Sequence, residues 1–190
     1  MSWRAGIVVA LASSACSQVF GLATPIVIDG PPPDRPIDVP TDIYTCTPVN
    51  LSCLDATVAF MCAGECWVGC RQTGLTWLQA GQRCSLWGGA LARFGSSSEQ
   101  DCALAMFAPQ GPTWIGLSQK PGQLIPKDGW IWEHDIPLTF VRWGPAEPDD
   151  ADGSESDHQE QCAVMDANGA WSDVDCGGGS GAPGFMCRRP

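Results

Sequence analysis

Cysteine content is the feature that most constrains how this chain can fold. Eleven of its 190 residues are cysteines, and in a reducing cytosol so many thiols would stay reactive unless metal ions bound them. An oxidising compartment, in which the cysteines form disulfides, is the better interpretation. When Cys16 is set aside, ten cysteines remain, an even number that fits five disulfides.

Residues 1–23 have the layout of a signal peptide. A basic residue precedes an apolar run, 5–11, which is followed by small residues and is too short to span a bilayer. Ser13 and Ala15 stand three and one positions before Cys16, so Cys16 is a candidate first mature residue that carries a lipid, as in bacterial lipoproteins. The alternative is ordinary cleavage there or after residue 23. We therefore expect a secreted or extracellular protein, or one anchored to the cell envelope through a lipid on Cys16.

Three further parts follow along the chain. Residues 24–45 are rich in proline and predict a stiff, extended spacer, residues 46–65 form a cysteine-rich extension, and residues 66–190 form the main domain. Cysteines 62, 66 and 70 stand at four-residue intervals, which on a helix would place three sulfurs on one face, as in a metal or iron–sulfur site. Disulfides are preferred, because such sites usually show tighter spacings and no histidine lies nearby.

Local signals predict two helices followed by short strands. A capping box at 76–79 opens a helix through Cys84, and the pattern at 96–99 opens a second through Leu104 and Met106. Four extended segments, separated by turns rich in Pro and Gly, follow at 113–117, 130–133, 162–165 and 185–187. Helices that precede strands in this way predict an α+β fold.

Acidic residues crowd one stretch near the end of the chain. Ten acids and no lysine or arginine lie between Glu147 and Asp175. Crowded carboxylates repel one another, and a hard divalent cation that prefers oxygen ligands would relieve the repulsion. Calcium fits better than zinc, because His158 is the one nitrogen ligand in the stretch. The alternative is a solvated acidic loop.

Several motifs stand in order along the second half of the chain. They are Trp114-Ile115-Gly116-Leu117, 140–143 leading into Glu147-Pro148-Asp149, Cys162, Trp171-Ser172-Asp173, Cys176 and Cys187. The series resembles the C-type lectin-like domain family over roughly residues 66–188. The resemblance implies a C-type lectin-like fold, with two helices, short antiparallel strands, a long calcium-binding loop region and a cis bond between Glu147 and Pro148.

The resemblance also implies two disulfides, Cys84 with Cys187 and Cys162 with Cys176. Six cysteines then remain (Cys46, Cys53, Cys62, Cys66, Cys70 and Cys102), and the sequence leaves their 15 pairings open. Because the family pattern does not require a cysteine where Cys102 stands, a bridge from it to the cluster at 62–70 is a plausible expectation.

The same resemblance implies a calcium site. Sugar-binding members hold calcium with a Glu-Pro-Asn segment, a later glutamate and a Trp-Asn-Asp motif. Carried over, the metal ligands are Glu147, Asp149, Glu160 and Asp173, with Ser172 in place of the second asparagine, and Glu147, Asp149, Glu160 and Ser172 also contact the ligand. Both asparagine donors are replaced here, and an ionised Asp149 only accepts hydrogen bonds. We therefore expect weakened sugar binding unless a water molecule or the long loop at 150–159 supplies a donor.

Taken together, these features predict a calcium-dependent lectin module that binds a glycan or glycoconjugate. The alternatives are a protein-binding domain of the same fold, with structural calcium or none, and a glycan-active hydrolase. Catalysis is not expected, because the chain has only two histidines, His134 and His158, and no nucleophile elbow. Nucleic acid and polybasic membrane binding are excluded, because 10 Lys and Arg stand against 21 Asp and Glu.

Overall fold

The structure is a computed structural model that describes residues 46–48, 50, 51, 53, 57–151, 160–177 and 184–190. The predicted signal, the lipidation candidate Cys16 and the spacer lie outside these residues, as does most of the long acidic loop with His158. No helix in the described part of the chain has the length and apolar character needed to cross a membrane.

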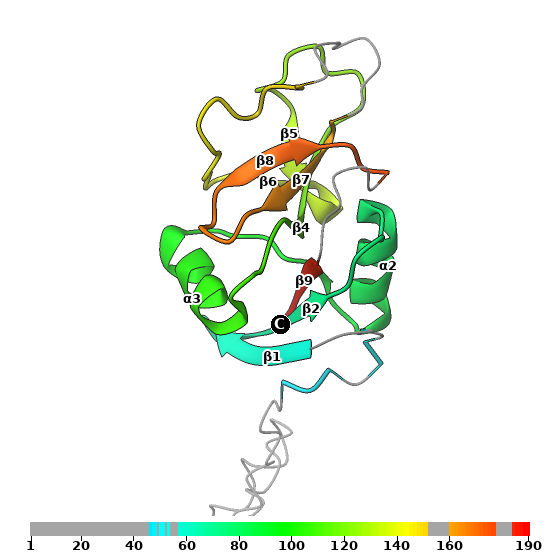
Figure 1. Cartoon of the computed structure of the whole chain (residues 1–190), viewed down its shortest axis with the longest axis vertical. Helices are drawn as coiled ribbons and strands as arrows, with labels where there is room; N and C mark the ends of the chain where they lie inside the picture. Colours follow the sequence, from blue (N-terminus) through cyan, green and yellow to red (C-terminus); the bar gives the residue numbers. More distant parts are fainter. Residues whose placement is uncertain (1–45, 49, 52, 54–56, 152–159, 178–183) are drawn as a thin grey trace, which may run out of the picture. The chain divides into compact units, whose positions relative to one another are not determined.

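Two helices and nine short strands make up the described elements (Figure 1). In chain order they are β1 (Thr57–Cys62), β2 (Glu65–Arg71), α2 (Trp77–Leu86), β3 (Ala90–Leu91), α3 (Ser97–Phe107), β4 (Thr113–Gln119), β5 (Trp130–Trp132), the 3-10 turn η1 (Glu133–Asp135), β6 (Ile136–Pro137), β7 (Cys162–Met165), β8 (Trp171–Val174) and β9 (Gly184–Arg189). The α+β fold class is confirmed.

The strands pair into one sheet. Its main path runs β1-β2-β9-β4-β5-β6, while β3 pairs with β9, and β7 joins β4 to β8. Every pair is antiparallel except β4 and β9, which run parallel with Trp114 opposite Phe185. This arrangement places β7 and β8 on a branch away from the β1–β2 edge (Figure 1).

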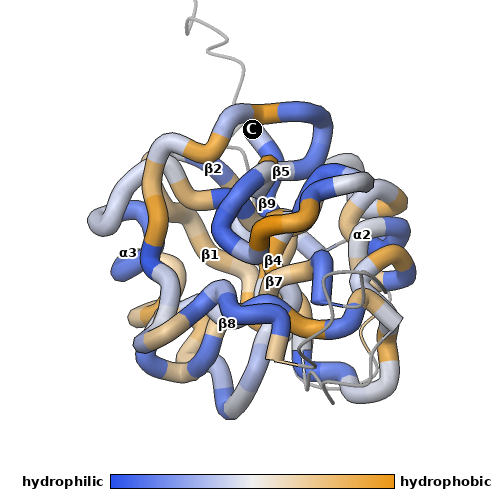
Figure 2. Tube along the Cα trace, turned by 90° about the horizontal axis from the view of Figure 1, so that it is seen from above, coloured by the Kyte–Doolittle hydropathy of each residue, from blue (hydrophilic) through white to orange (hydrophobic). Residues whose placement is uncertain are grey.

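The sheet is buried on both faces, with one helix on each. Neighbouring residues of β4 point to opposite faces, so Trp114 joins the core cluster that includes Cys84 of α2, whereas Ile115 joins the cluster that includes Phe107 of α3. Hydrophilic residues mark much of β8 in Figure 2. The core therefore holds Trp171 at the start of β8, and the buried Asp173 two residues later is the acidic residue of the same strand.

Both predicted helices begin at their expected caps. The Thr76 hydroxyl accepts a hydrogen bond from the Gln79 N–H at 3.1 Å, and the Thr76 N–H donates to the Gln79 side chain at 3.0 Å, so this capping box is complete. At α3 the Ser96 hydroxyl accepts from the Glu99 N–H, but the Glu99 carboxylate accepts from the Gly95 N–H instead of the cap residue. The helices run slightly past the predicted ends, to Leu86 and Phe107.

The four predicted extended segments correspond to β4, β5, β7 and β9, except that Glu133 begins a 3-10 turn. The hairpin of β1 and β2 was not anticipated. Its two-residue turn has positive φ at both Ala63 (53°) and Gly64 (79°), as a type I′ turn requires. Because cysteines 62, 66 and 70 lie on these strands and not on one helix face, the alternative of a metal or iron–sulfur site there is wrong.

All ten described cysteines form disulfides. Cys84 is bonded to Cys187 and Cys162 to Cys176, the two pairs that the resemblance implies. The other three pairs, which the sequence left open, are Cys46–Cys66, Cys53–Cys70 and Cys62–Cys102. Five bridges thus tie the segment before β1 to β2, β1 to α3, α2 to β9, and β7 to the residue that follows Asp175.

Candidate metal and ligand site

Three carboxylates meet where the segment before the acidic loop crosses β8. Glu147, Asp149 and Asp173 each offer an oxygen, and these oxygens all lie within 4.8 Å of one another. The first two belong to the segment that contains the cis bond between Glu147 and Pro148, and Asp173 belongs to β8. Sequence positions more than 20 residues apart are therefore brought into one cluster.

Asp173 anchors the cluster. Its side chain is buried, and its two oxygens accept hydrogen bonds from the backbone N–H groups of Asp149 (3.1 Å) and Asp150 (3.0 Å). A carboxylate offers about four lone-pair sites, so these two bonds leave acceptor capacity for a cation. The contact explains why the segment lies over β8, and the part played by the Asp150 N–H has no signature in the sequence.

The pKa of Glu147 is shifted by its burial and by its acidic neighbours. Partial burial, a hydrogen bond with Asp173 and the negative charges of Asp149 and Asp173 together raise the pKa of the Glu147 carboxyl group to about 7. A hydrogen bond with the Ser172 side chain acts in the opposite direction. In the absence of a cation the cluster thus retains a proton near neutral pH, because three adjacent negative charges are unfavourable.

The two remaining predicted ligands, Glu160 and Ser172, are not members of this cluster. The Glu160 carboxylate accepts a hydrogen bond from the Ala151 N–H at 2.5 Å, which draws the two ends of the long loop together. Ser172 contacts Glu147 through its hydroxyl. Glu147, Asp149 and Asp173 thus form the close set, Ser172 contacts it through Glu147, and Glu160 contacts the backbone at Ala151.

Two other acids of the stretch accept hydrogen bonds from backbone N–H groups within local turns. Asp166 accepts hydrogen bonds from the N–H groups of Asn168 and Ala170, both at 2.8 Å, and Asp175 accepts one from the Gly177 N–H at 2.7 Å. Neither joins the three-carboxylate cluster. Acid density along the sequence therefore indicated the region of the site but not which of its members converge.

The donor set suits a hard cation. Carboxylate oxygens from three residues, two of them on a segment held by backbone hydrogen bonds, are ligands that calcium prefers, and calcium accepts six to eight oxygens in flexible geometry. Negative charge is concentrated here without a compensating base, since three carboxylates converge and no described Lys or Arg forms an ion pair with them. The residues present therefore fit calcium.

Comparison with known proteins gives one consistent answer. The family model described as the lectin C-type domain matches residues 73–188. Asialoglycoprotein receptor 2 of Mus musculus is 32% identical over 131 residues, which is 69% of this chain and 39% of that protein. Lymphocyte antigen 75 of Homo sapiens is 30% identical over 128 residues, 67% of this chain but only 7% of that protein. The chain therefore spans less than half the length of these relatives.

Solved structures agree with the sequence matches. The C-type carbohydrate-recognition domain of cow CD23, solved in the presence of a GlcNAc2Man3 oligosaccharide, superposes with a TM-score of 0.57 at 29% identity. The superposition covers 73% of this chain and 95% of that domain.

Proposed function

The chain belongs to the C-type lectin domain family, and from that premise we propose that it is a calcium-dependent glycan-binding module. The observation that carries the proposal is the convergence of Glu147, Asp149 and Asp173 within 4.8 Å. The relatives support the glycan as ligand class, because one is named an asialoglycoprotein receptor and another was solved with an oligosaccharide. None of the relatives named above is described as an enzyme.

Glu147, Asp149 and Asp173 would hold the calcium ion, with Glu160 and Ser172 at its margin. Bound calcium would supply a positive charge that attracts ligand hydroxyl oxygens. The surrounding carboxylates would accept the hydrogen atoms of those hydroxyls, because ionised carboxylates only accept. The protein would be secreted or extracellular, and a lipid on Cys16 would anchor it to the cell envelope.

A protein ligand is the second candidate, because donors are scarce around the cluster. The N–H groups of Asp149 and Asp150 are already bonded to Asp173, and the Ser172 hydroxyl is engaged with Glu147. Vicinal sugar hydroxyls need donors as well as acceptors for full pairing. A protein partner could bring its own N–H groups to the acidic rim. This candidate keeps the same fold and the same calcium site, or uses the fold without calcium.

Calcium binding is tested by thermal unfolding of three proteins. Calcium should raise the melting temperature of the parent, because a ligand that binds only the folded state stabilises it. Asp149→Ala should remove most of that increase, because it deletes one of the three carboxylates, and the exposed Asp149 side chain makes no other described contact. Asp135→Asn, which changes an exposed acid outside the cluster, should retain the full increase. Equal increases in all three proteins would show that the cation binds elsewhere.

The two ligand candidates are separated by a glycan array read with and without a calcium chelator. Binding that the chelator abolishes supports the glycan. Calcium-dependent stabilisation without binding to any arrayed glycan supports the protein ligand.

A further inference from the structure

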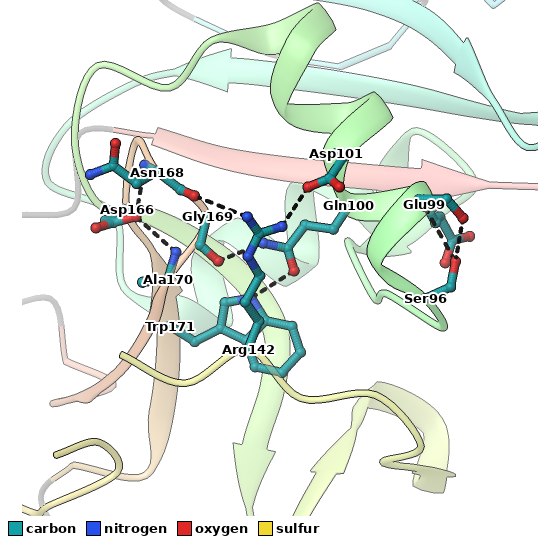
Figure 3. A network of polar contacts seen from close by, with 11 residues as sticks. Ser96, Glu99, Gln100, Asp101, Arg142, Asp166, Asn168, Gly169, Ala170 and Trp171 are labelled. Carbon is teal, nitrogen blue, oxygen red and sulfur yellow. Dashed lines mark hydrogen bonds and ion pairs between the residues drawn. The ribbon is translucent and has the colours of Figure 1, made fainter. Parts of the chain in front are cut away.

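A buried glutamine connects α3 to the elements that carry the site. Gln100 is 0% exposed. Its Nε2 donates to the Gly169 carbonyl at 2.5 Å, and its Oε1 accepts from the Trp171 indole N–H at 3.1 Å (Figure 3). A buried amide is costly unless both its groups are paired. The two bonds therefore hold the turn before β8 and the first residue of β8 against the helix.

Trp171, which Gln100 holds in place, is in turn hydrogen-bonded to a second segment, residues 142–144. Its backbone N–H donates to the Arg142 carbonyl at 2.8 Å, and its carbonyl accepts from the Gly144 N–H at 2.8 Å. Its ring also contacts four aromatic rings, those of Phe94, Trp132, Phe140 and Trp143, at centroid distances of 5.4–6.2 Å. The indole that Gln100 holds is thus wedged between the core and the chain segment 142–144.

Both segments held in this way lead directly to the carboxylates. Asp173 follows Trp171 by two residues on β8, and Glu147 follows Gly144 by three residues, with the Glu147 N–H donating to the Gly144 carbonyl at 3.2 Å. The two metal-ligand candidates therefore diverge from one anchored point. A shift of Trp171 would displace Asp173 relative to Glu147.

The surroundings of Gln100 reinforce the contact. Gly169 has φ of +85°, and a Cβ there would lie 2.6 Å from the Gln100 Nε2, so the turn accepts only glycine beside this amide. Outside it, Arg142 contacts the Asp101 carboxylate at 2.5 Å and the Asn168 carbonyl at 3.4 Å (Figure 3). That outer ion pair is largely solvated and contributes little by itself, which leaves Gln100 as the main contact.

We propose that Gln100 is a positioning residue for the calcium site, which it keeps assembled before any cation arrives. The role of Gln100 in calcium binding rests on the proposed function, whereas its contacts with Gly169 and Trp171 do not depend on it. Three carboxylates repel one another, so a scaffold must hold them at close range. Gln100 does this from α3, a helix that contributes no ligand, by fixing Trp171 and through it the bases of both ligand-bearing segments.

The test uses two variants of Gln100 and one matched control. Gln100→Met removes both hydrogen bonds at nearly constant length, and Gln100→Asn is a milder change that keeps an amide but cannot reach both partners. Val68→Ala is the control, because Val68 is fully buried in the core cluster on the α2 side, whereas Trp171 belongs to the cluster on the α3 side. The control lowers overall stability without altering the anchor.

The first measurement needs no metal. Amide hydrogen exchange is followed at Asp149 and Asp150, whose N–H groups bond to Asp173. Both amides should exchange about tenfold faster in the Gln100 variants, the change expected from losing one buried hydrogen bond, and within about twofold of the parent rate in Val68→Ala. Equal acceleration in the variants and the control would overturn the inference, because Gln100 would then act only on global stability. If Gln100→Met does not fold, Gln100→Asn decides the same question.

The second measurement is the calcium dissociation constant of each folded protein by titration calorimetry at 25 °C. The Gln100 variants should bind about tenfold more weakly, and Val68→Ala should match the parent. Equal affinities in all proteins would also overturn the inference. Absence of calcium binding by the parent would instead contradict the proposed function, and the exchange rates would still decide the role of Gln100.

Discussion

At the scale of single residues, the three carboxylates of the cluster have different structural and electrostatic roles. Asp173 is buried and its oxygens bind backbone N–H groups, so it holds the segment in place as well as facing the cation. Glu147 is half-buried and has a pKa raised to about 7. Asp149 is exposed and adds negative charge. The titration of the empty site is therefore expected to centre on Glu147.

The stability of the metal-free protein should depend on the protonation of Glu147. Its pKa is about 7 in the folded state against an ordinary 4.5, so the folded state binds the proton more tightly than the unfolded state. The resulting stabilisation is complete below pH 4.5 and is lost as the pH rises through about 7. Glu147→Gln, which keeps a hydrogen-bonding group without the charge, should not show this loss.

The measurement is urea unfolding of both proteins in chelator between pH 4 and pH 8. As the pH rises through this range, the free energy of unfolding of the variant should increase relative to that of the parent. Calcium should restore the stability of the parent most strongly at pH 8, because protons compete with the cation. A stability difference that does not change with pH would contradict the raised pKa.

The donor deficit around the cluster predicts the effect of restoring two amides. Asp149→Asn combined with Ser172→Asn places an N–H donor at each position, so the double variant should bind vicinal-diol sugars more tightly than the parent in calcium, by about tenfold or less. The measurement is a monosaccharide competition assay. Because the change also removes one carboxylate, calcium affinity is measured alongside as the control. Equal or weaker sugar binding at saturating calcium would refute the donor argument.

At the scale of elements, the sequence predicted those whose signals are local. The cap at Thr76 and the apolar run of β4 depend on adjacent residues, and both appear where expected. The hairpin of β1 and β2 was missed because its cysteines at four-residue intervals also suit a helix face. Its strand character is decided by pairing with β9, more than 100 residues away, where Val68 lies opposite Cys187.

The candidate site shows the same division. The ten acids predicted the region, and the resemblance supplied Glu147, Asp149, Glu160, Ser172 and Asp173, of which three, Glu147, Asp149 and Asp173, meet in the structure. Neither could indicate Gln100, because a glutamine in a helix is ordinarily exposed, and its burial here depends on where the β7–β8 turn packs. Positioning contacts between distant elements leave no local pattern to recognise.

Close packing between β2 and α3 gives a prediction for Gly69. A Cβ at this position would lie 1.9 Å from the Phe107 ring, which is itself buried. Gly69→Ala should therefore destabilise the protein by about 1–3 kcal/mol, the usual cost of overpacking a filled core. The readout is the midpoint of urea unfolding.

Gly95→Ala is the matched control. A Cβ there meets only the Glu99 carboxylate, at an ordinary 3.5 Å, so the midpoint should change little. A parent-like midpoint for Gly69→Ala would mean that α3 packs less tightly against β2 than the structure shows.

At the scale of the whole molecule, disulfides connect elements that the sheet alone joins weakly. β3 has two residues, and β7 reaches the main path only through β4. Cys62–Cys102 links β1 to α3, and Cys84–Cys187 links α2 to β9, so each helix is bonded to a strand of the sheet it covers. The two helix layers are thereby fixed to the scaffold from which the site projects.

These bridges should not contribute equally to stability. Cys84 and Cys187 are separated by 103 residues, and Cys162 and Cys176 by 14. A crosslink stabilises mainly by restricting the unfolded chain, by about 4.7 kcal/mol for a 100-residue loop and about 3 kcal/mol for a 15-residue loop. Removing the long bridge with paired Cys→Ala changes should therefore lower the free energy of unfolding more than removing the short one. Both cysteines of the long bridge are also fully buried, which adds a packing loss.

The two paired variants should differ in the opposite order at the calcium site. Cys176 follows Asp173 by three residues and ties the end of β8 to β7, so losing the short bridge loosens the strand that carries Asp173. We expect the variant lacking Cys162–Cys176 to bind calcium more weakly than the variant lacking Cys84–Cys187, although it is the more stable of the two. Urea unfolding in chelator and calcium titration on the same preparations give both rankings. A single ranking shared by stability and affinity would show that calcium binding follows global stability instead of the local order of β8.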